Sequence, residues 1–200
     1  MYMGDVKSKT FLDTNASSAT FVAAAARPTT TFTLAKTSFG TNTARKITAT
    51  TTGTSDNGKT ITIVGKDHNN EDATEVITLT GSAETSSGTT TAFLSITSAT
   101  VSAQPAGNVS LGMTADVFGS VFQGRTRVRQ VNAESGGAIG SVLFRDGSLT
   151  GTALLTVRTG ATAGDINTVN IPQDGILYKD GAFVTFDETQ CNSATVYFDG

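Results

Sequence analysis

The sequence KITATTTGTSDNGKTITIVG occupies residues 46–65 and holds two runs of alternating residues joined by turn residues. In residues 46–52 and 60–65 the apolar side chains recur with a period of two, which is the spacing of a strand with one buried face. Residues 53–58 lie between these runs, and Asn57-Gly58 is a strong local signal for a tight turn. The stretch therefore predicts two short strands connected by a turn.

The same pattern of short strands and polar turns continues along the chain in both directions. In the next run, Ile77 and Leu79 face one side and Val76 faces the other. Dipeptides such as Asp146-Gly147 and Asp180-Gly181 predict turns between the later runs. The remaining predicted strands cover residues 75–80, 93–102, 108–113, 125–131, 139–144, 153–158, 167–171, 175–178, 182–186 and 195–198.

Composition predicts an all-β fold with thin cores. Hydrophobic residues make up 38% of the 200-residue chain, which also has 21 glycines and no tryptophan. Threonine is β-branched and favours strands, whereas glycine supplies the backbone conformations that tight turns require. We expect two small antiparallel β-sandwiches, immunoglobulin-like or jelly-roll-like, preceded by an extended N-terminal arm.

A shift in composition predicts the domain boundary. Of the 37 threonines, 26 lie in residues 1–100, and the change falls near residues 114–124. We expect an arm over residues 1–30, a threonine-rich sandwich over residues 31–117 and a second sandwich over residues 118–200. Within the arm, residues 21–26 can form one helical turn that Pro28 ends.

Charge and cysteine content exclude several classes of protein. The net charge of −3 and the pI of about 5.1 argue against nucleic-acid binding through bulk charge. A single cysteine, Cys191, cannot form an intrachain disulfide. No apolar run approaches the roughly 20 residues of a membrane span, and the N-terminus lacks the pattern of a secretion signal. We expect synthesis in a cytosol.

The residues that carry most enzyme chemistry are scarce. His68 is the sole histidine and lies among polar residues typical of an exposed turn, so we expect a solvated side chain. Cys191 has no histidine near it in sequence to act as a base. One histidine and one cysteine make a zinc site improbable. We therefore predict no catalytic residue, no cofactor and no metal site.

The carboxylates raise two further questions, calcium binding and glycan hydrolysis. Asp67, Asn69 and Glu71 alternate like the start of a calcium loop, but the glycine and glutamate expected later in such a loop are missing. A plain hairpin turn is favoured there, with calcium binding by residues 67–72 left undecided. The pair of carboxylates that glycan hydrolysis needs is not indicated, because the candidates are scattered among turn positions. These are Glu75, Glu84, Asp165, Asp174 and Asp187.

One charged feature stands out in GRTRVRQV, residues 124–131. Arg125, Arg127 and Arg129 occupy alternate positions, so on a strand all three side chains point to one face. Like charges in a row repel one another, which gives a monomer little benefit. We predict that the row meets acidic groups of a neighbouring subunit or of the adjoining sheet. The alternative is a charged edge strand that discourages aggregation.

Two stretches also carry a resemblance to known proteins. Residues 46–112, through ITATTTGTSDNGKTITIVGKD, ATEVITLTGSAETSSGTTTAFLSITSATVS and AGNVSLG, resemble a module of bacteriophage virion proteins. The last eighty residues, through SGG, VLF-DG, LLTV and GILYKDGAFVTF, resemble another small phage module. The family consists of minor virion structural proteins of the head-decoration or neck-tail type, and it brings no catalytic residues with it.

The resemblance implies a non-enzymatic structural role in a virion. The first expectation is a capsid decoration, or cement, protein that binds the major capsid protein and forms trimers or larger symmetric oligomers. The second is a neck or tail component such as a collar, adaptor or fibre-like protein. A glycan-binding adhesin of the host surface is a third, which the few aromatic residues disfavour. No nucleic acid or membrane partner is expected, and an enzyme comes last.

Overall fold

The computed structural model describes residues 5–13, 15–80 and 88–200, and it is all-β. The described residues form 14 strands and one short 3-10 helix, η1 (Thr54–Asp56). The chain divides into two compact units. Unit 1 contains Met1–Asn15, Gly40–Thr43 and Asp116–Gly200, and unit 2 contains Ala16–Phe39 and Ala44–Ala115. The prediction of an all-β fold with antiparallel sheets is confirmed.

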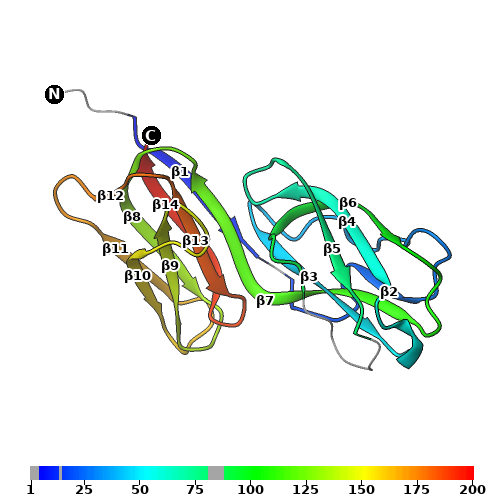
Figure 1. Cartoon of the computed structure of the whole chain (residues 1–200). Helices are drawn as coiled ribbons and strands as arrows, with labels where there is room; N and C mark the ends of the chain where they lie inside the picture. The colour runs from blue at the N-terminus through cyan, green and yellow to red at the C-terminus, as the bar shows by residue number, and fades with distance from the viewer. Residues whose placement is uncertain (1–4, 14, 81–87) are drawn as a thin grey trace. The chain divides into compact units, whose positions relative to one another are not determined.

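Unit 1 is a sandwich of two antiparallel sheets (Figure 1). One sheet has the order β1-β14-β8-β11, with β12 also paired to β8. The other has the order β10-β9-β13-β7, to which β7 contributes its second half. The strands are β1 (Lys7–Leu12), β7 (Val109–Phe122), β8 (Thr126–Ser135), β9 (Gly140–Asp146), β10 (Ala153–Thr159), β11 (Ile166–Asn170), β12 (Ile176–Tyr178), β13 (Ala182–Asp187) and β14 (Cys191–Asp199).

Alternating side chains from both sheets form the core of unit 1. Val128 and Val131 of β8 face Val142 and Phe144 of β9 within one buried cluster. Phe11 of β1 is fully buried in this cluster and requires a glycine on β7. A Cβ atom at Gly119 would lie 2.3 Å from Cε1 of the Phe11 ring, which is far closer than any normal contact.

Unit 2 is built on the first half of β7. Along the sheet the order continues β7-β3-β6-β4-β5, and β2 pairs with the other side of β7. An extended segment runs beside β6, where Phe32 N–H donates to the Ala99 carbonyl at 2.9 Å. The strands are β2 (Ala23–Ala26), β3 (Ala44–Thr51), β4 (Thr60–Asp67), β5 (Asp72–Thr78) and β6 (Phe93–Val101).

A buried carboxylate organises one end of unit 2. Asp56 of η1 is fully buried and accepts hydrogen bonds from four donors. Its Oδ1 accepts from Lys59 Nζ at 2.9 Å and from Ala106 N–H at 2.6 Å. Its Oδ2 accepts from the Thr51 hydroxyl at 2.9 Å and from Gly107 N–H at 3.1 Å. The turn after β3 is thereby joined to the loop before β7.

The N-terminal region and the boundary differ in part from expectation. Lys7–Leu12 is not part of a separate arm but is β1, which pairs antiparallel with β14. The predicted helical turn over residues 21–26 is wrong, because Ala23–Ala26 is strand β2. Residues 1–4 and 14 of the expected arm lie outside the described residues. The chain passes from unit 2 to unit 1 after Ala115, two residues before the expected boundary.

Substitution of Gly119 tests the packing of Phe11. Gly119→Ala forces a methyl group into the Phe11 ring, so we expect a loss of roughly 1–3 kcal/mol in the free energy of unfolding. Gly160→Ala is the matched control, because its nearest neighbour would lie 4.0 Å away, and it should change stability by less than about 1 kcal/mol. Denaturant unfolding measures both. Equal effects would contradict the packing described for β1.

The lowered pKa of Asp56 makes the stability of the fold depend on pH. Burial alone would raise the pKa of Asp56, but the hydrogen bonds from Lys59, Ala106, Gly107 and Thr51 outweigh it and hold the pKa well below its usual value. Because the pKa is lower in the folded state, ionised Asp56 stabilises the fold at pH values above the ordinary aspartate pKa of about 3.9. This stabilisation is lost as the pH falls through the lowered pKa.

We therefore expect Asp56→Asn to cost roughly 1.5–3 kcal/mol at neutral pH and to flatten the loss of stability below about pH 5. Asp72→Asn is the control, because the Asp72 side chain is 92% exposed. Denaturant unfolding at several pH values checks the prediction. An unchanged acid limb in Asp56→Asn would show that this carboxylate is not the group responsible.

Candidate functional site

The row of arginines lies where the alternating pattern predicts. Arg127 and Arg129 lie on β8 with the buried Val128 between them, so both point away from the core of unit 1. Arg125 is exposed and directly precedes the strand. β8 pairs with β14 on one side and with β11 and β12 on the other. The alternative of a charged edge strand is therefore wrong.

Arg129 already has acidic partners within unit 1. Its Nε donates to Asp199 Oδ2 at 2.6 Å, and its Nη1 donates to the Gln173 carbonyl at 3.1 Å. The Asp174 carboxylate lies 3.9 Å from the same Nη1. The hydrogen bond to Asp199 is the main cause of a raised pKa of Arg129, which keeps the guanidinium charged. Arg129 thus links β8 to β14.

Arg125 and Arg127 border a shallow hollow of about 260 Å³. Thr126, Leu177 and Asp199 complete its lining together with Gly200. Arg127 makes one long hydrogen bond, from Nη1 to the Asp174 carbonyl at 3.4 Å. Within the described residues, no hydrogen bond or ion pair engages the Arg125 guanidinium. Two cations beside a single carboxylate make this hollow suitable for an acidic side chain of another protein.

Exposed hydrophobic side chains gather on the strands that end each sheet. Leu12 of β1 and Ile166 of β11 are 37% and 69% exposed, and these strands end one sheet. Leu154 of β10 and Val76 of β5 are 40% and 52% exposed, and these are the first and last strands in the order β10-β9-β13-β7-β3-β6-β4-β5. Edge strands of monomeric proteins are usually protected by charge or by bulges. β1 and β5 carry charged residues and β10 has a register shift at Leu154, yet each of the four terminal strands also presents one large exposed apolar side chain.

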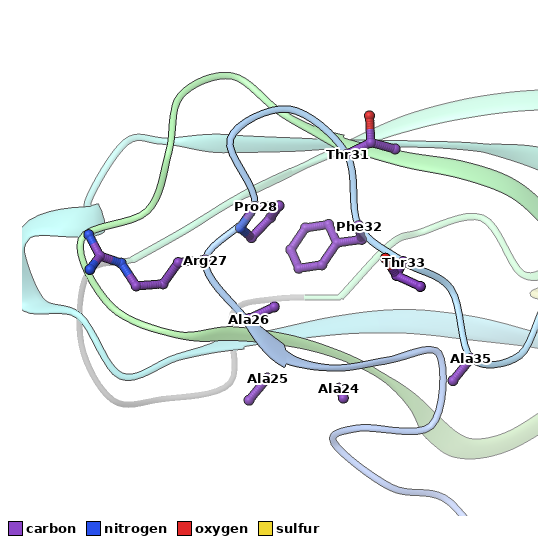
Figure 2. Close-up of a pocket in the computed structure, with 9 residues that line it drawn as sticks. All are labelled: Ala24, Ala25, Ala26, Arg27, Pro28, Thr31, Phe32, Thr33 and Ala35. Carbon is purple, nitrogen blue, oxygen red and sulfur yellow. The ribbon is translucent and has the colours of Figure 1, made fainter.

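A second hollow lies beside β2 in unit 2. It has a volume of about 370 Å³, and its lining includes Pro28, Phe32 and three alanines of β2, namely Ala24, Ala25 and Ala26. Figure 2 shows the Phe32 ring pointing toward Pro28, with the Arg27 side chain extending away from the ring. Arg27 Nε donates to the Pro105 carbonyl at 2.9 Å, which fixes this side of the rim. The hollow is largely apolar and suits a small apolar side chain.

The histidine and the cysteine belong to different units, and the two side chains are buried to different degrees. The His68 side chain is only 17% exposed, so the prediction of a solvated histidine is wrong. Burial lowers the pKa of His68, although Asp67 and Glu71 act in the opposite direction. Cys191 is fully buried, and burial raises the pKa of its thiol to about 12, so it stays protonated at neutral pH.

In the turn at residues 67–72, the Asp67 carboxylate accepts hydrogen bonds from the backbone. Asp67 Oδ1 accepts from Asn69 N–H at 2.8 Å and from Glu71 N–H at 3.0 Å. Asn70 has a positive φ of 66°, as expected for asparagine in a tight turn. Across the described ranges, no three acidic, histidine or cysteine side chains gather where they could hold a metal ion.

Comparisons with protein-family models, with curated proteins and with solved structures find no match to this chain. In the part of the chain that the structure describes, no helix is long and apolar enough to cross a membrane.

Substituting the arginines separates structural from partner-binding roles. We expect Arg129→Ser to lower the thermal unfolding midpoint, because Asp199 loses its charged hydrogen-bond donor. Arg125→Ser and Arg127→Ser should leave the midpoint nearly unchanged, because within the described residues neither guanidinium has a carboxylate partner and Arg127 makes only one long hydrogen bond, to the Asp174 carbonyl. A fall in the midpoint as large for the Arg125→Ser, Arg127→Ser double variant as for Arg129→Ser would contradict this division and leave these two arginines no role separate from stability.

Proposed function

We propose that this protein is a non-enzymatic structural component of a bacteriophage virion, most simply a capsid decoration protein that stabilises the head lattice. The observation that carries this proposal is the set of exposed apolar side chains on the four terminal strands. An isolated protein gains nothing from these side chains, whereas a subunit packed among others buries them. The resemblance of residues 46–112 and of the last eighty residues to phage modules supports the same role.

β5 is the best placed of these strands for contact with another protein. Within the described residues its backbone pairs with β4 alone, which leaves its other edge open to a strand of a partner. Val76 of β5 and Val64 of β4 are both exposed, and both point away from the core that buries Ile77 and Ile63. A strand added along β5 would therefore bury an apolar side chain as well as form backbone hydrogen bonds.

The other surface features fit the same role. The apolar hollow beside β2 can accept a side chain, and the Arg125–Arg127 hollow can accept a carboxylate. Each contact is small, but a lattice repeats it around symmetry axes, so many weak contacts act together. The partners in this proposal are the major capsid protein or other virion proteins and further copies of this chain.

A lysine on the open edge tests the proposal. Val76→Lys places a charge where a partner strand would pair, so we expect a severalfold loss of incorporation into particles. Folding should be retained, because Val76 is 52% exposed. Ile139→Lys is the matched control, because Ile139 is 72% exposed but lies outside every strand, just before β9. Quantitative mass spectrometry of purified particles measures incorporation.

Two results would overturn the proposal. Folded Val76→Lys that enters particles as well as the wild type would show that the β5 edge makes no contact. Absence of the wild-type protein from washed particles would exclude a virion component altogether. A circular dichroism spectrum matching the wild type confirms that each variant is folded before it is compared.

A further inference from the structure

A polar hollow lies on unit 1 and shares no lining residue with the two hollows described above. It has a volume of about 370 Å³ and is formed over β7, β9 and β13. Val142, Phe144 and Val184 of these strands point into the core. The alternate residues Leu143 and Thr185 line the hollow, so it occupies the opposite face of the sheet.

Strand register determines which side chains meet there. Thr185 of β13 lies opposite Phe118 of β7 and Leu143 of β9. One step along the same face, Asp187 of β13 lies directly opposite Asp116 of β7. Two carboxylates in directly opposed positions repel each other and destabilise a sheet. Their placement beside an apolar patch is therefore unfavourable for the protein alone.

Several hydrogen-bonding groups of the hollow are not used within the protein. Among the described residues, no hydrogen bond or ion pair engages the Asp116 carboxylate. Asp187 Oδ1 accepts from Thr189 N–H at 2.8 Å and from the Thr189 hydroxyl, and within the described residues Oδ2 accepts no hydrogen bond. Arg145 donates from Nη1 to the Gly151 carbonyl at 2.9 Å, which leaves the donors of Nη2 available.

Gln190 is held in place with its donor end unused. Its Oε1 accepts from Ser141 N–H at 3.2 Å, whereas Nε2 donates no hydrogen bond to any of the described residues. The side chain lies over Gly140, where a Cβ atom would approach Oε1 to 1.9 Å. Gly140 therefore makes room for the amide. The hollow thus combines acceptors from two carboxylates, donors from Arg145 and Gln190, and an apolar lining from the half-buried Leu143 and Leu149.

We propose that this hollow binds a neutral sugar residue of a glycan. A sugar hydroxyl both donates and accepts hydrogen bonds, so it matches a surface with unused donors and acceptors side by side. The C–H face of a sugar ring can pack against the half-buried side chains of Leu143 and Leu149, in keeping with the mixed character of ligand sites. The two carboxylates outnumber the single guanidinium, so an anionic ligand is repelled. The site binds one sugar through paired donors and acceptors and does not use the aromatic surface whose scarcity disfavours an adhesin. This property goes beyond the structural role and does not depend on it.

The test uses the full-length protein and four defined sugars: chitotriose, maltotriose, lactose and 3′-sialyllactose. Two-dimensional ¹⁵N-edited NMR follows the backbone amides during titration. We expect at least one neutral sugar to shift amides of residues 116–118, 141–145 and 185–190. We also expect 3′-sialyllactose to bind more weakly than lactose, because its carboxylate meets Asp116 and Asp187.

Matched variants identify the binding groups. Asp116→Ala removes an unused and exposed carboxylate, so it should leave folding intact and weaken binding of the best sugar about tenfold or more. Asp165→Ala is the control, because it removes one carboxylate from the loop before β11, outside the hollow.

The proposal is overturned by any of three results. These are no shifts with any neutral sugar at 10 mM (roughly the limit for a single weak site), shifts confined to residues outside the hollow, or equal affinity of Asp116→Ala and the wild type. Tighter binding of 3′-sialyllactose than of lactose would contradict the charge argument on which the choice of a neutral sugar depends.

Discussion

The structure depends on one strand, β7, whose 14 residues serve two hydrophobic cores. Val109, Leu111 and Met113 belong to the core of unit 2, and Val117 and Val121 belong to that of unit 1. Between these groups, the fully buried Arg45 donates from Nη1 to the carbonyls of Thr114 and Ala115, at 2.6 and 2.7 Å. These bonds satisfy two backbone acceptors and help to offset the cost of burying a charged side chain. Neither core is complete without its part of this strand.

Most strands could be predicted because one face of each is buried. Residues 60–65 and 93–102 alternate clearly, and the structure places β4 and β6 there, with Ile61, Ile63 and Ile96 in the core. The missed strands are those whose partners are distant in sequence. β1 has one large buried apolar side chain, Phe11, and β2 consists of four alanines, so neither shows a strong period. Only pairing with β14 and β7 makes them strands.

The candidate surfaces were harder to predict from the sequence than the fold was. Alternation was sufficient to place Arg127 and Arg129 on one face of β8, because side-chain direction in a strand is a local property. The partner of Arg129 was not predictable, since Asp199 is brought near only by the register of β14 against β8. The same holds for Asp116 and Asp187, which are 71 positions apart in the sequence and directly opposite in the sheet. Likewise, the sequence does not show that β1, β5, β10 and β11 are terminal strands, because that depends on the order of the strands in the sheets.

The central claim is that this protein is a structural subunit repeated on a virion, which makes its copy number per particle the most direct measurement. Quantitative mass spectrometry of purified particles would compare it with the major capsid protein. The account predicts a simple fractional ratio, corresponding to copies in the hundreds, as a lattice-wide contact requires. A count of about a dozen or fewer would contradict the decoration role and favour a neck or tail component, and a count of zero would contradict any virion role.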